Sequence, residues 1–344
     1  MTVLRLIADD LTGALDAAAP FATPDAPVHL VLDLAAVPLQ ASLTHSTESR
    51  DLPKAAAEQH VRAAHAALGA GLAGAGLWGA GLWFKKIDSV LRGHPFAETL
   101  ALAQAGGFRR CVFTPAFPDM GRILRDGHAL MRGANGAWQA AWPGPVRDGF
   151  GDALGLDVVV FDAETPDDLR EGVRPYLGDP NTLWAGSGGL ARALAPPVTP
   201  LPAPPVGLFI LGTSHPATRA QAFALAALTQ PAPSNGTIHP QGHAPLLLDP
   251  VPASPDAQNT RAALRASLSR LMPPQDGSAL LITGGDCLAL LLRVTAATGL
   301  VCLGEVAPGL PLSRIIGGRL DGARIISKSG GFGPPEALCR FIRG

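Results

Sequence analysis

Short apolar runs alternate along this chain with longer stretches in which alanine and leucine recur at helical spacing. Such alternation is typical of an α/β protein built on a mainly parallel sheet. Several runs are apolar at nearly every position, as expected for strands that helices cover on both faces. The predicted strands are Val3–Ala8, Val28–Leu32, Leu82–Ile87, Cys111–Thr114, Val158–Phe161, Thr182–Ala185, Leu208–Leu211, Leu280–Thr283, Val301–Leu303 and Arg324–Ser327. The predicted helices are Leu11–Ala22, Ala55–Leu68, Phe96–Ala105, Pro166–Leu177, Ala217–Leu228, Thr260–Leu271 and Cys287–Ala297.

A proline-rich segment interrupts this pattern past the middle of the chain. Residues Ala195–Val206 read APPVTPLPAPPV, and their six prolines exclude a helix interior or a central strand. We therefore expect two α/β domains, 1–195 and 207–344, joined by a linker at 196–206. Because clefts between domains favour ligand sites, we expect the active site in such a cleft. A second proline-rich stretch, Pro231–Pro255, predicts a long loop inside the second domain.

Charge and composition exclude several classes of partner. Across 344 residues, 27 basic side chains nearly balance 28 acidic ones and the net charge is -1, which argues against a nucleic-acid or anionic-membrane partner. No apolar run reaches the ~18 residues that cross a bilayer, and the N-terminal residues lack a signal-peptide pattern. The 4 cysteines form no C-x-x-C pair, so free thiols are expected in place of disulfides or a zinc site. These features predict a soluble, cytoplasmic protein.

One glycine pattern matches a dinucleotide-binding motif but stands in the wrong order. Gly69, Gly71 and Gly74 satisfy G-x-G-x-x-G, yet a helix is predicted before them and a strand after them. A dinucleotide site needs the strand first and the helix second. We therefore interpret Leu68–Trp83 as a loop, which makes a nicotinamide-dependent oxidoreductase the least favoured alternative.

Polar residues gather at the predicted carboxyl ends of strands in the first domain. Asp9 and Asp10 follow the first strand and precede a helix, at the edge where open α/β sheets bind ligands. One Asp suffices to cap the helix, so the pair favours a site over the alternative of simple capping. In the segment FKKIDSVLRG, strand alternation turns Lys86 and Asp88 to one face and Lys85 to the other. A solvated edge strand would also carry such charges.

Three turns rich in glycine and hydroxyl groups occur in the second domain. They are Gly212–Thr218, Thr283–Asp286 and Ser327–Gly333. The first two precede predicted helices, and the backbone N–H groups at a helix start attract phosphate. Each could be only a tight turn after a strand, but three in one domain favour a nucleotide phosphate site.

Lysine is scarce in this chain, and its positions coincide with these segments. The 27 basic residues include the lysines Lys54, Lys85, Lys86 and Lys328. Three of these fall in the polar clusters just described. We interpret their retention in an arginine-rich chain as a further pointer to a site in each half.

Taken together, these segments resemble the four-carbon acid sugar kinase family, formerly classed as a domain of unknown function. The landmarks appear in order over nearly the whole chain: IADDLTGA, TESR, KKIDSVLRG, PAFPDMGR, FDAET, AGSGGLA, LGTSHPATRAQ, LITGGD, GEVAPGLPL and SKSGGFG. The resemblance implies a kinase that uses ATP and Mg²⁺ to phosphorylate the terminal hydroxyl of a small sugar acid such as threonate, erythronate or 3-oxo-tetronate. It also implies that the first domain binds the sugar acid and the second binds ATP.

The resemblance assigns roles to residues in both domains. The expected sugar-acid contacts are Asp9, Asp10, Arg50, Lys86, Asp88 and Arg92, which suit a ligand with one carboxylate and several hydroxyls. The expected ATP contacts are Thr213, Ser214, His215, Thr218, Gly284, Gly285, Asp286, Gly330 and Gly331. Either Asp88 or Asp10 would accept the proton of the attacking hydroxyl, and either Lys328 or Arg92 would support the transferred phosphoryl group. The sequence assigns no metal ligand.

The chain departs from the family pattern at four positions. Ser46 stands where the family usually has Asp, and Val90 where it usually has Thr. His215 and Cys287 change two of the glycine-rich turns. The main alternative is therefore a protein of the same fold that binds a sugar acid or a nucleotide without turnover. Exposed sheet edges in such folds often pair, which leaves a homo-oligomer open.

Overall fold

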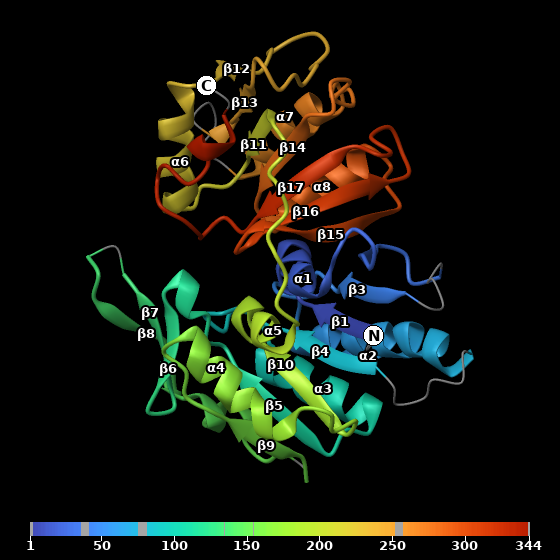
Figure 1. The fold of residues 1–344 in the computed structure, drawn as a ribbon, viewed down its shortest axis with the longest axis vertical. Helices are drawn as coiled ribbons and strands as arrows, with labels where there is room; N and C mark the ends of the chain where they lie inside the picture. Colours follow the sequence, from blue (N-terminus) through green and yellow to red (C-terminus); the bar gives the residue numbers. More distant parts are fainter. Residues whose placement is uncertain are drawn as a thin grey trace. The chain divides into compact units, whose positions relative to one another are not determined.

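The computed structural model describes residues 3–35, 41–74, 81–133, 135–153, 155–251 and 257–342. The chain forms two compact units, Met1–Val198 and Thr199–Gly344 (Figure 1). Both combine a sheet with helices, which confirms the predicted α/β class. Within the described residues, no helix is both long enough and apolar enough to cross a membrane.

The first unit is built on a parallel sheet. Its strands follow the order β2-β3-β1-β4-β10-β5-β9, and each neighbouring pair is parallel. The strands are β1 (Val3–Ala8), β2 (Val28–Val31), β3 (Ser42–Ser46), β4 (Gly81–Lys86), β5 (Arg110–Thr114), β9 (Asp157–Val160) and β10 (Thr182–Gly186). The helices are α1 (Leu11–Ala18), α2 (Lys54–Gly74), α3 (Pro95–Gly106), α4 (Pro166–Val173) and α5 (Gly188–Leu194).

Helices cover both faces of this parallel sheet. Arg5 of β1 donates from Nε to the carbonyl oxygen of Leu68 in α2 at 2.9 Å, so α2 lies on the face to which Arg5 points, and α3 packs against α2. Leu4 and Leu6 alternate to the other face, on which α1 packs against α5. Burial on both faces explains why these strands are apolar at nearly every position.

A small antiparallel sheet accompanies the parallel one in the first unit. It comprises β6 (Arg122–Arg125), β7 (His128–Arg132) and β8 (Trp138–Pro145), in that order. Figure 1 shows it beside the parallel sheet. Sequence reasoning missed this sheet because β6 begins and ends with arginine, while β8 contains two prolines and a glycine, which are uncommon inside strands.

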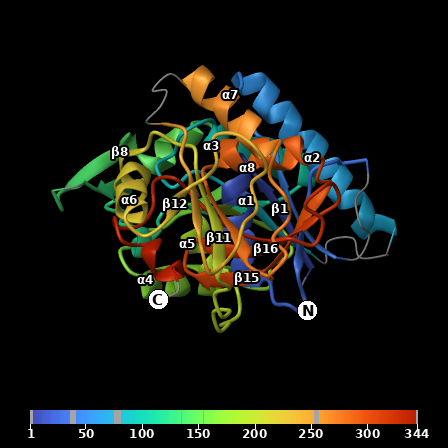
Figure 2. The ribbon, with the colours of Figure 1, turned by 90° about the horizontal axis from the view of Figure 1, so that it is seen from above.

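The second unit contains a mixed sheet in the order β12-β13-β11-β14-β17-β16-β15. The strands are β11 (Val206–Leu211), β12 (Gln230–Pro231), β13 (Leu246–Leu248), β14 (Ala279–Thr283), β15 (Gly299–Ala307), β16 (Leu310–Ile316) and β17 (Arg324–Lys328). Neighbours from β12 to β17 are parallel, whereas β16 runs antiparallel to both β17 and β15. The helices are α6 (Pro216–Ala226), α7 (Ala257–Leu268) and α8 (Gly285–Val294), of which α7 contacts α8 (Figure 2).

The predicted strands and helices all have counterparts, but several ends differ. Pro20 and Pro175 lack the N–H that would continue a helix, so the predicted helices Leu11–Ala22 and Pro166–Leu177 finish as 3-10 turns after Ala18 and Val173. Besides β6, β7 and β8, strands β3, β12, β13 and β16 and helix α5 were not predicted. Of these, β13 interrupts the predicted loop Pro231–Pro255, in which residues 252–256 lie outside the described part of the chain.

The glycines of the dinucleotide-like motif lie in a helix. Gly69, Gly71 and Gly74 belong to the last turns of α2, so the loop prediction was wrong for these positions. The remaining part of that predicted loop, 75–80, lies outside the described residues. Glycines inside a helix cannot form the turn after a strand that holds a dinucleotide, so the pattern carries no cofactor site.

Candidate active site

Polar side chains of the first unit meet at the carboxyl edge of its parallel sheet. In the register of the strands, Ala8 of β1 pairs with Ser46 of β3 on one side and with Lys86 of β4 on the other. The segments that follow these three strand ends carry the residues expected to contact a sugar acid. Three separate parts of the sequence are thereby brought to one place.

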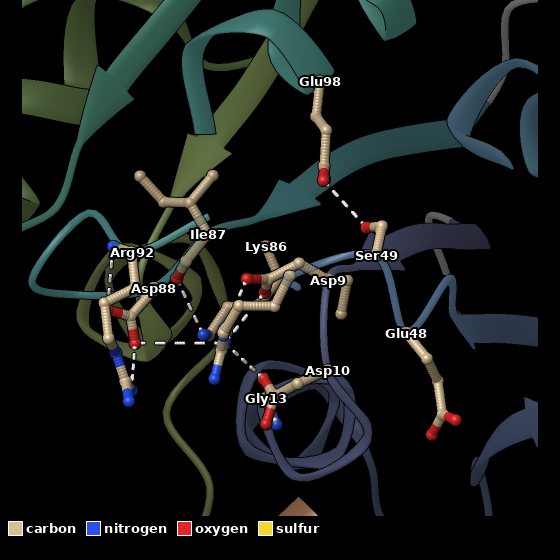
Figure 3. A network of polar contacts seen from close by, with 12 residues as sticks. Asp9, Asp10, Gly13, Glu48, Ser49, Lys86, Ile87, Asp88, Arg92 and Glu98 are labelled. Carbon is tan, nitrogen blue, oxygen red and sulfur yellow. Dashed lines mark hydrogen bonds and ion pairs between the residues drawn. The ribbon is translucent and has the colours of Figure 1, made fainter. Parts of the chain in front are cut away.

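Arg50 links the acidic residues of this cluster. Its Nε donates to Asp9 Oδ2 at 2.8 Å and its Nη2 to Asp9 Oδ1 at 3.1 Å, a bidentate ion pair. Nη2 also donates to Asp10 Oδ1 at 2.8 Å and lies 3.9 Å from Asp88 Oδ1. The carboxylates of Asp10 and Asp88 thus converge on one guanidinium, and Figure 3 shows them turned toward a common centre.

Asp10 also caps helix α1. Its Oδ1 accepts the backbone N–H of Gly13 at 3.2 Å, and its Oδ2 accepts the hydroxyl of Thr12 at 2.7 Å. A Cβ at Gly13 would lie 2.3 Å from Asp10 Oδ1 and 3.1 Å from Lys86 Nζ, so only glycine leaves this carboxylate in place. Asp10 therefore caps the helix and at the same time belongs to the polar cluster around Arg50.

Lys86 and Lys85 occupy opposite faces of β4, as strand alternation predicts. Lys86 Nζ donates to the carbonyl oxygen of Ile87 at 2.8 Å, and its charge acts on both Asp10 and Asp88. Lys85 instead pairs with Glu98 of α3 at 2.7 Å in the interior of the unit. Lys85 is therefore no part of the cluster, although it belongs to the same sequence motif.

Asp88 organises the turn that follows β4. Its Oδ2 accepts the backbone N–H groups of Val90 and Arg92, each at 3.2 Å, and Arg92 Nε at 3.0 Å. Its Oδ1 accepts Arg92 Nη2 at 2.7 Å. Within this turn Leu91 has a φ of 63°, a left-handed conformation that these bonds stabilise. The Arg92 side chain remains 62% exposed, which leaves it accessible to a ligand.

The positive groups of the cluster keep the carboxylates of Asp10 and Asp88 ionised. Burial alone would raise the pKa of Asp10 and of Asp88, since it disfavours charge. For Asp10, Arg50 and Lys86 outweigh that effect, and the pKa lies below its usual range. For Asp88, the hydrogen bonds from Arg92 and the charge of Arg50 lower the pKa well below that range. Both side chains are therefore charged hydrogen-bond acceptors near neutral pH.

Arg122 is a candidate that residue-level reasoning did not single out. It begins β6, its Nη1 donates to the carbonyl oxygen of Met120, and burial lowers its pKa. The charges of Asp88 and Arg92 also act on that pKa, which places Arg122 near the cluster. The signal in the sequence was its position in PAFPDMGR, a polar segment after a predicted strand.

The three glycine-rich turns of the second unit come together in the same way. They follow β11, β14 and β17, which are neighbours in the sheet. Thr218 Oγ1 of α6 donates to the carbonyl oxygen of Gly330 at 2.8 Å. The N–H of Gly284 donates to the carbonyl oxygen of Lys328 at 2.9 Å. A Cβ at Gly330 would approach Thr213 Cγ2 to 3.1 Å. The first and third turns are therefore packed tightly against each other.

Two helices begin at this edge of the second unit. His215 caps α6, because its Nδ1 accepts the backbone N–H of Ala217 at 3.2 Å. Helix α8 begins at Gly285, after Gly284 with a φ of 92°. Ser214 and Asp286 are exposed beside these helix starts. Helix starts present backbone N–H groups and positive dipole ends, which suit a phosphate.

Lys328 and Arg219 are cations that contact these turns. Lys328 is 3% exposed, its Nζ donates to the carbonyl oxygen of Ser329 at 2.8 Å, and burial lowers its pKa to about 8. Arg219 donates from Nε to the carbonyl oxygen of Thr213 at 2.9 Å, and its Nη1 pairs with both oxygens of Asp249 at 2.7 and 2.8 Å. Sequence reasoning missed Arg219 and Asp249, because Asp249 lies in the second proline-rich stretch.

The cysteines and the potential metal ligands of the described residues form neither disulfides nor a metal-binding group. All four cysteines lie in the described part of the chain and are free, as expected. Among the described residues, no group of three or more His, Cys, Asp or Glu side chains could hold a metal ion.

Comparisons with known proteins match this division of the chain. A family model described as a sugar-binding N-terminal domain matches residues 4–141, and one described as a nucleotide-binding C-terminal domain matches residues 249–338. A D-threonate kinase of Cupriavidus necator is 29% identical over 97% of this chain and 95% of its own. A D-threonate kinase of Bordetella bronchiseptica is 29% identical over 98% and 96%.

A solved structure from Salmonella typhimurium LT2 has the same fold. It is 18% identical, covers 99% of this chain and 98% of its own, and superposes with a TM-score of 0.66. The similarity to D-threonate kinases extends over nearly the full length, and both halves match their own family models in order. The chain belongs to the four-carbon acid sugar kinase family.

Proposed function

We propose that this protein is an ATP-dependent kinase that phosphorylates the terminal hydroxyl of a four-carbon sugar acid. The observation that carries the proposal is the cluster at the carboxyl edge of the first sheet, in which Asp9, Asp10 and Asp88 alternate with Arg50, Lys86 and Arg92. A sugar acid carries one carboxylate and several hydroxyls, and so requires both kinds of partner. The relatives named D-threonate kinase support this class of substrate.

The two candidate proton acceptors differ in how fully they are engaged. Asp88 Oδ2 already accepts three donors and Oδ1 a fourth, so this carboxylate serves to hold the turn. Asp10 Oδ2 accepts the Thr12 hydroxyl, and the side chain is 20% exposed. A carboxylate oxygen offers about two lone pairs, so Asp10 Oδ2 retains the capacity to accept a substrate hydroxyl. We assign to Asp10 the orientation of the attacking hydroxyl and the acceptance of its proton.

The sugar-acid carboxylate would bind to the exposed cation of the cluster. Arg92 is the most exposed of its cationic side chains, and a guanidinium can donate two parallel hydrogen bonds to a carboxylate. Lys86, buried beside Asp10, would donate to a hydroxyl close to the reacting end. Phosphoryl transfer is achieved chiefly by alignment and by neutralisation of charge, so this division of roles suits the reaction.

ATP would bind at the three turns of the second unit. The starts of α6 and α8, with Thr213, Ser214 and Thr218 and the glycines 284, 285, 330 and 331, offer backbone N–H and hydroxyl groups to its phosphates. Lys328 beneath the third turn would support the transferred phosphoryl group. In-line transfer requires the terminal hydroxyl of the bound sugar acid to meet the terminal phosphate of the bound ATP.

The residues present are compatible with Mg²⁺. Magnesium usually keeps several waters and binds through one or two carboxylates together with the substrate phosphates, so a dedicated cage is not required. Asp286, exposed in the first turn of α8, is the carboxylate that would hold it in the second unit. When bound, the ion would neutralise charge on the phosphates.

One observation favours the alternative of a protein that binds without turnover. The imidazole of His215 accepts the Ala217 N–H, which is one of the amides at the start of α6 that a phosphate would otherwise use. A nucleotide would then have to displace this ring. Isothermal titration of ADP and of a sugar acid, combined with an assay of ADP release from ATP, separates the two functions. A binder without turnover would bind both ligands yet release no product.

The decisive test is product formation with a panel of sugar acids. The purified protein is incubated with ATP, Mg²⁺ and D-threonate, L-threonate, D-erythronate or 3-oxo-tetronate, and phosphate esters are followed by ³¹P NMR together with ADP release. We expect one acid to yield a phosphomonoester at its terminal carbon. Absence of any ester across the panel, with ATP consumed no faster than without acid, would refute the proposal.

A further inference from the structure

A buried ion pair lies behind the candidate sugar-acid cluster, on the opposite face of β4. Lys85 Nζ is 2.7 Å from Glu98 Oε2, and the two side chains are 0% and 1% exposed. Replacing such a pair by apolar residues is often neutral or stabilising, so stability alone is a weak reason for its presence. Its other contacts point to a different role.

The pair is joined to the loop that carries Arg50. Glu98 Oε1 accepts a hydrogen bond from Ser49 Oγ at 2.7 Å, and the two side chains face each other in Figure 3. Ser49 is fully buried, and its hydroxyl also lies 2.7 Å from Thr47 Oγ1. Since Ser49 immediately precedes Arg50, the carboxylate of Glu98 fixes the backbone from which that guanidinium extends.

The loop needs such an anchor because its backbone is strained. Glu48 has a φ of 47°, a left-handed conformation that residues other than glycine adopt at a cost. Contacts on both sides of it hold this conformation: Thr47 donates its N–H and its hydroxyl to the carbonyl oxygen of Ala8, each at 2.9 Å, and the Ser49 N–H donates to that of Asp9 at 3.1 Å. Arg50 follows, and its guanidinium donates a hydrogen bond to each carboxylate oxygen of Asp9.

Lys85 also contacts the backbone of its own strand, β4. Besides pairing with Glu98, its Nζ donates to the carbonyl oxygen of Lys86 at 2.8 Å. One buried ammonium thus contacts both the carboxylate that holds Ser49 and the backbone of the lysine in the cluster. Lys85 thereby compensates the buried charge of the carboxylate that accepts the Ser49 hydroxyl.

We propose that Glu98, paired with Lys85 and acting through Ser49, is a positioning residue that sets Arg50 for the sugar acid. The inference rests on the proposed function of the cluster, but the geometry of the loop can be tested without it. Neither Glu98 nor Ser49 touches the substrate in this scheme. Their effect is confined to the sugar-acid side of the reaction.

The test begins with Ser49→Ala, matched by Thr99→Val. Thr99 is an equally buried hydroxyl on the same helix as Glu98 and is bonded within that helix to the carbonyl oxygen of Pro95. We expect Ser49→Ala to lower kcat/KM for the sugar acid about tenfold, as for loss of a hydrogen bond to a charged group, and to leave KM for ATP unchanged. Thr99→Val should leave both constants near those of the wild type.

A pair of double variants separates the hydrogen bond from the buried charge. Lys85→Met with Glu98→Gln removes both charges but keeps an amide oxygen that accepts the hydrogen bond from Ser49. The kcat/KM of this double variant for the sugar acid should be close to that of the wild type. Lys85→Met with Glu98→Leu removes the acceptor as well and should behave like Ser49→Ala. Equal constants for the two double variants would overturn the proposal.

Hydrogen–deuterium exchange of the loop gives a readout that does not depend on turnover. Ser49→Ala should speed the exchange of the Thr47 and Ser49 amides, which donate to the carbonyl oxygens of Ala8 and Asp9, while Thr99→Val should not. Unchanged exchange in Ser49→Ala would also overturn the proposal. Faster exchange in a protein that phosphorylates none of the acids would leave the positioning role standing and refute the proposed function instead.

Discussion

Lys85 and Lys86 are consecutive residues of β4, and their ammonium groups lie on opposite sides of one sheet. Lys85 forms an ion pair with Glu98 in the interior, whereas Lys86 faces Asp10 at the carboxyl edge. The same residue type therefore has two different sets of partners at adjacent positions. This difference can be measured, because stability and activity should respond separately to the two lysines.

Lys85→Met should destabilise the protein strongly. It leaves the carboxylate of Glu98 buried without its cation, and removing one partner of a buried pair costs about 3–5 kcal/mol of unfolding free energy. Lys86→Met should cost less stability, because Arg50 still neutralises Asp10, but it should reduce sugar-acid kcat/KM. Urea unfolding and steady-state kinetics of both variants check this. An equal loss of stability in the two would show that Lys86 is as structural as Lys85.

Asp10→Asn should reduce kcat by roughly 10²–10⁴-fold while the fold is retained. Asparagine caps a helix about as well as aspartate, so the bond to the Gly13 N–H and the start of α1 should survive. The amide cannot accept a proton from the attacking hydroxyl. Turnover is measured beside circular dichroism and the thermal midpoint. Wild-type kcat in a folded Asp10→Asn protein would remove Asp10 from the chemistry.

Gly13→Ala should disturb the cluster although alanine favours helices. The new Cβ would lie 2.3 Å from Asp10 Oδ1, so the carboxylate must leave its place. We expect a fall of sugar-acid kcat/KM by about tenfold or more, which corresponds to about 1.4 kcal/mol.

Gly69→Ala in α2 is the matched control for this glycine. Its Cβ would meet Trp83 at an ordinary 3.8 Å, and the change should stabilise the helix by about 0.5–1 kcal/mol. Denaturant unfolding and kinetics of both alanine variants are compared. A similar kinetic effect at the two positions would contradict the steric argument at Gly13.

The affinity for ATP should fall as pH rises through about 8. Burial lowers the Lys328 pKa from 10.5 to about 8, so the free protein loses this ammonium above that pH, and with it a partner for phosphate. Measured KM for ATP should rise between pH 7 and pH 9 in the wild type and stay flat in Lys328→Arg, whose side chain remains charged. The same rise in both proteins would exclude Lys328 as the group that titrates.

Stability should show the opposite trend in the same region. Between pH 8 and 10.5, Lys328 is less protonated in the folded protein than in the unfolded chain. Its contribution to the free energy of unfolding therefore increases with pH over that interval. Below pH 8 both states are protonated and the contribution is constant. Lys328→Met should lack this increase in denaturant unfolding experiments at successive pH values.

The sequence predicted best what depends on apolar patterning and on strand ends. Runs such as Leu280–Thr283 are buried on both faces, and the clusters after β1 and β4 follow from the alternation along a strand. It failed at β3, which reads SLTHS and is nevertheless buried because strands flank it on both sides. Local pattern cannot reveal burial that comes from distant strands.

The members of the polar cluster were predictable, but the contacts that distinguish them from one another were not. Asp10 and Asp88 could not be separated by sequence, because their difference lies in how many donors each carboxylate already accepts. Glu98 gave no signal, since its role depends on a helix being placed behind β4. Arg219 and Asp249 likewise meet only after folding, 30 residues apart in the chain.

Strand β10 lies between β4 and β5 although it is made from residues 182–186, well after both. The match to the sugar-binding family model stops at residue 141 and so leaves this strand out. A fragment cut there would leave the edges of β4 and β5 without their shared partner. Recombinant expression of the sugar-acid half in isolation should therefore extend through α5, and nascent chains on the ribosome can complete this sheet only after residue 186 has emerged.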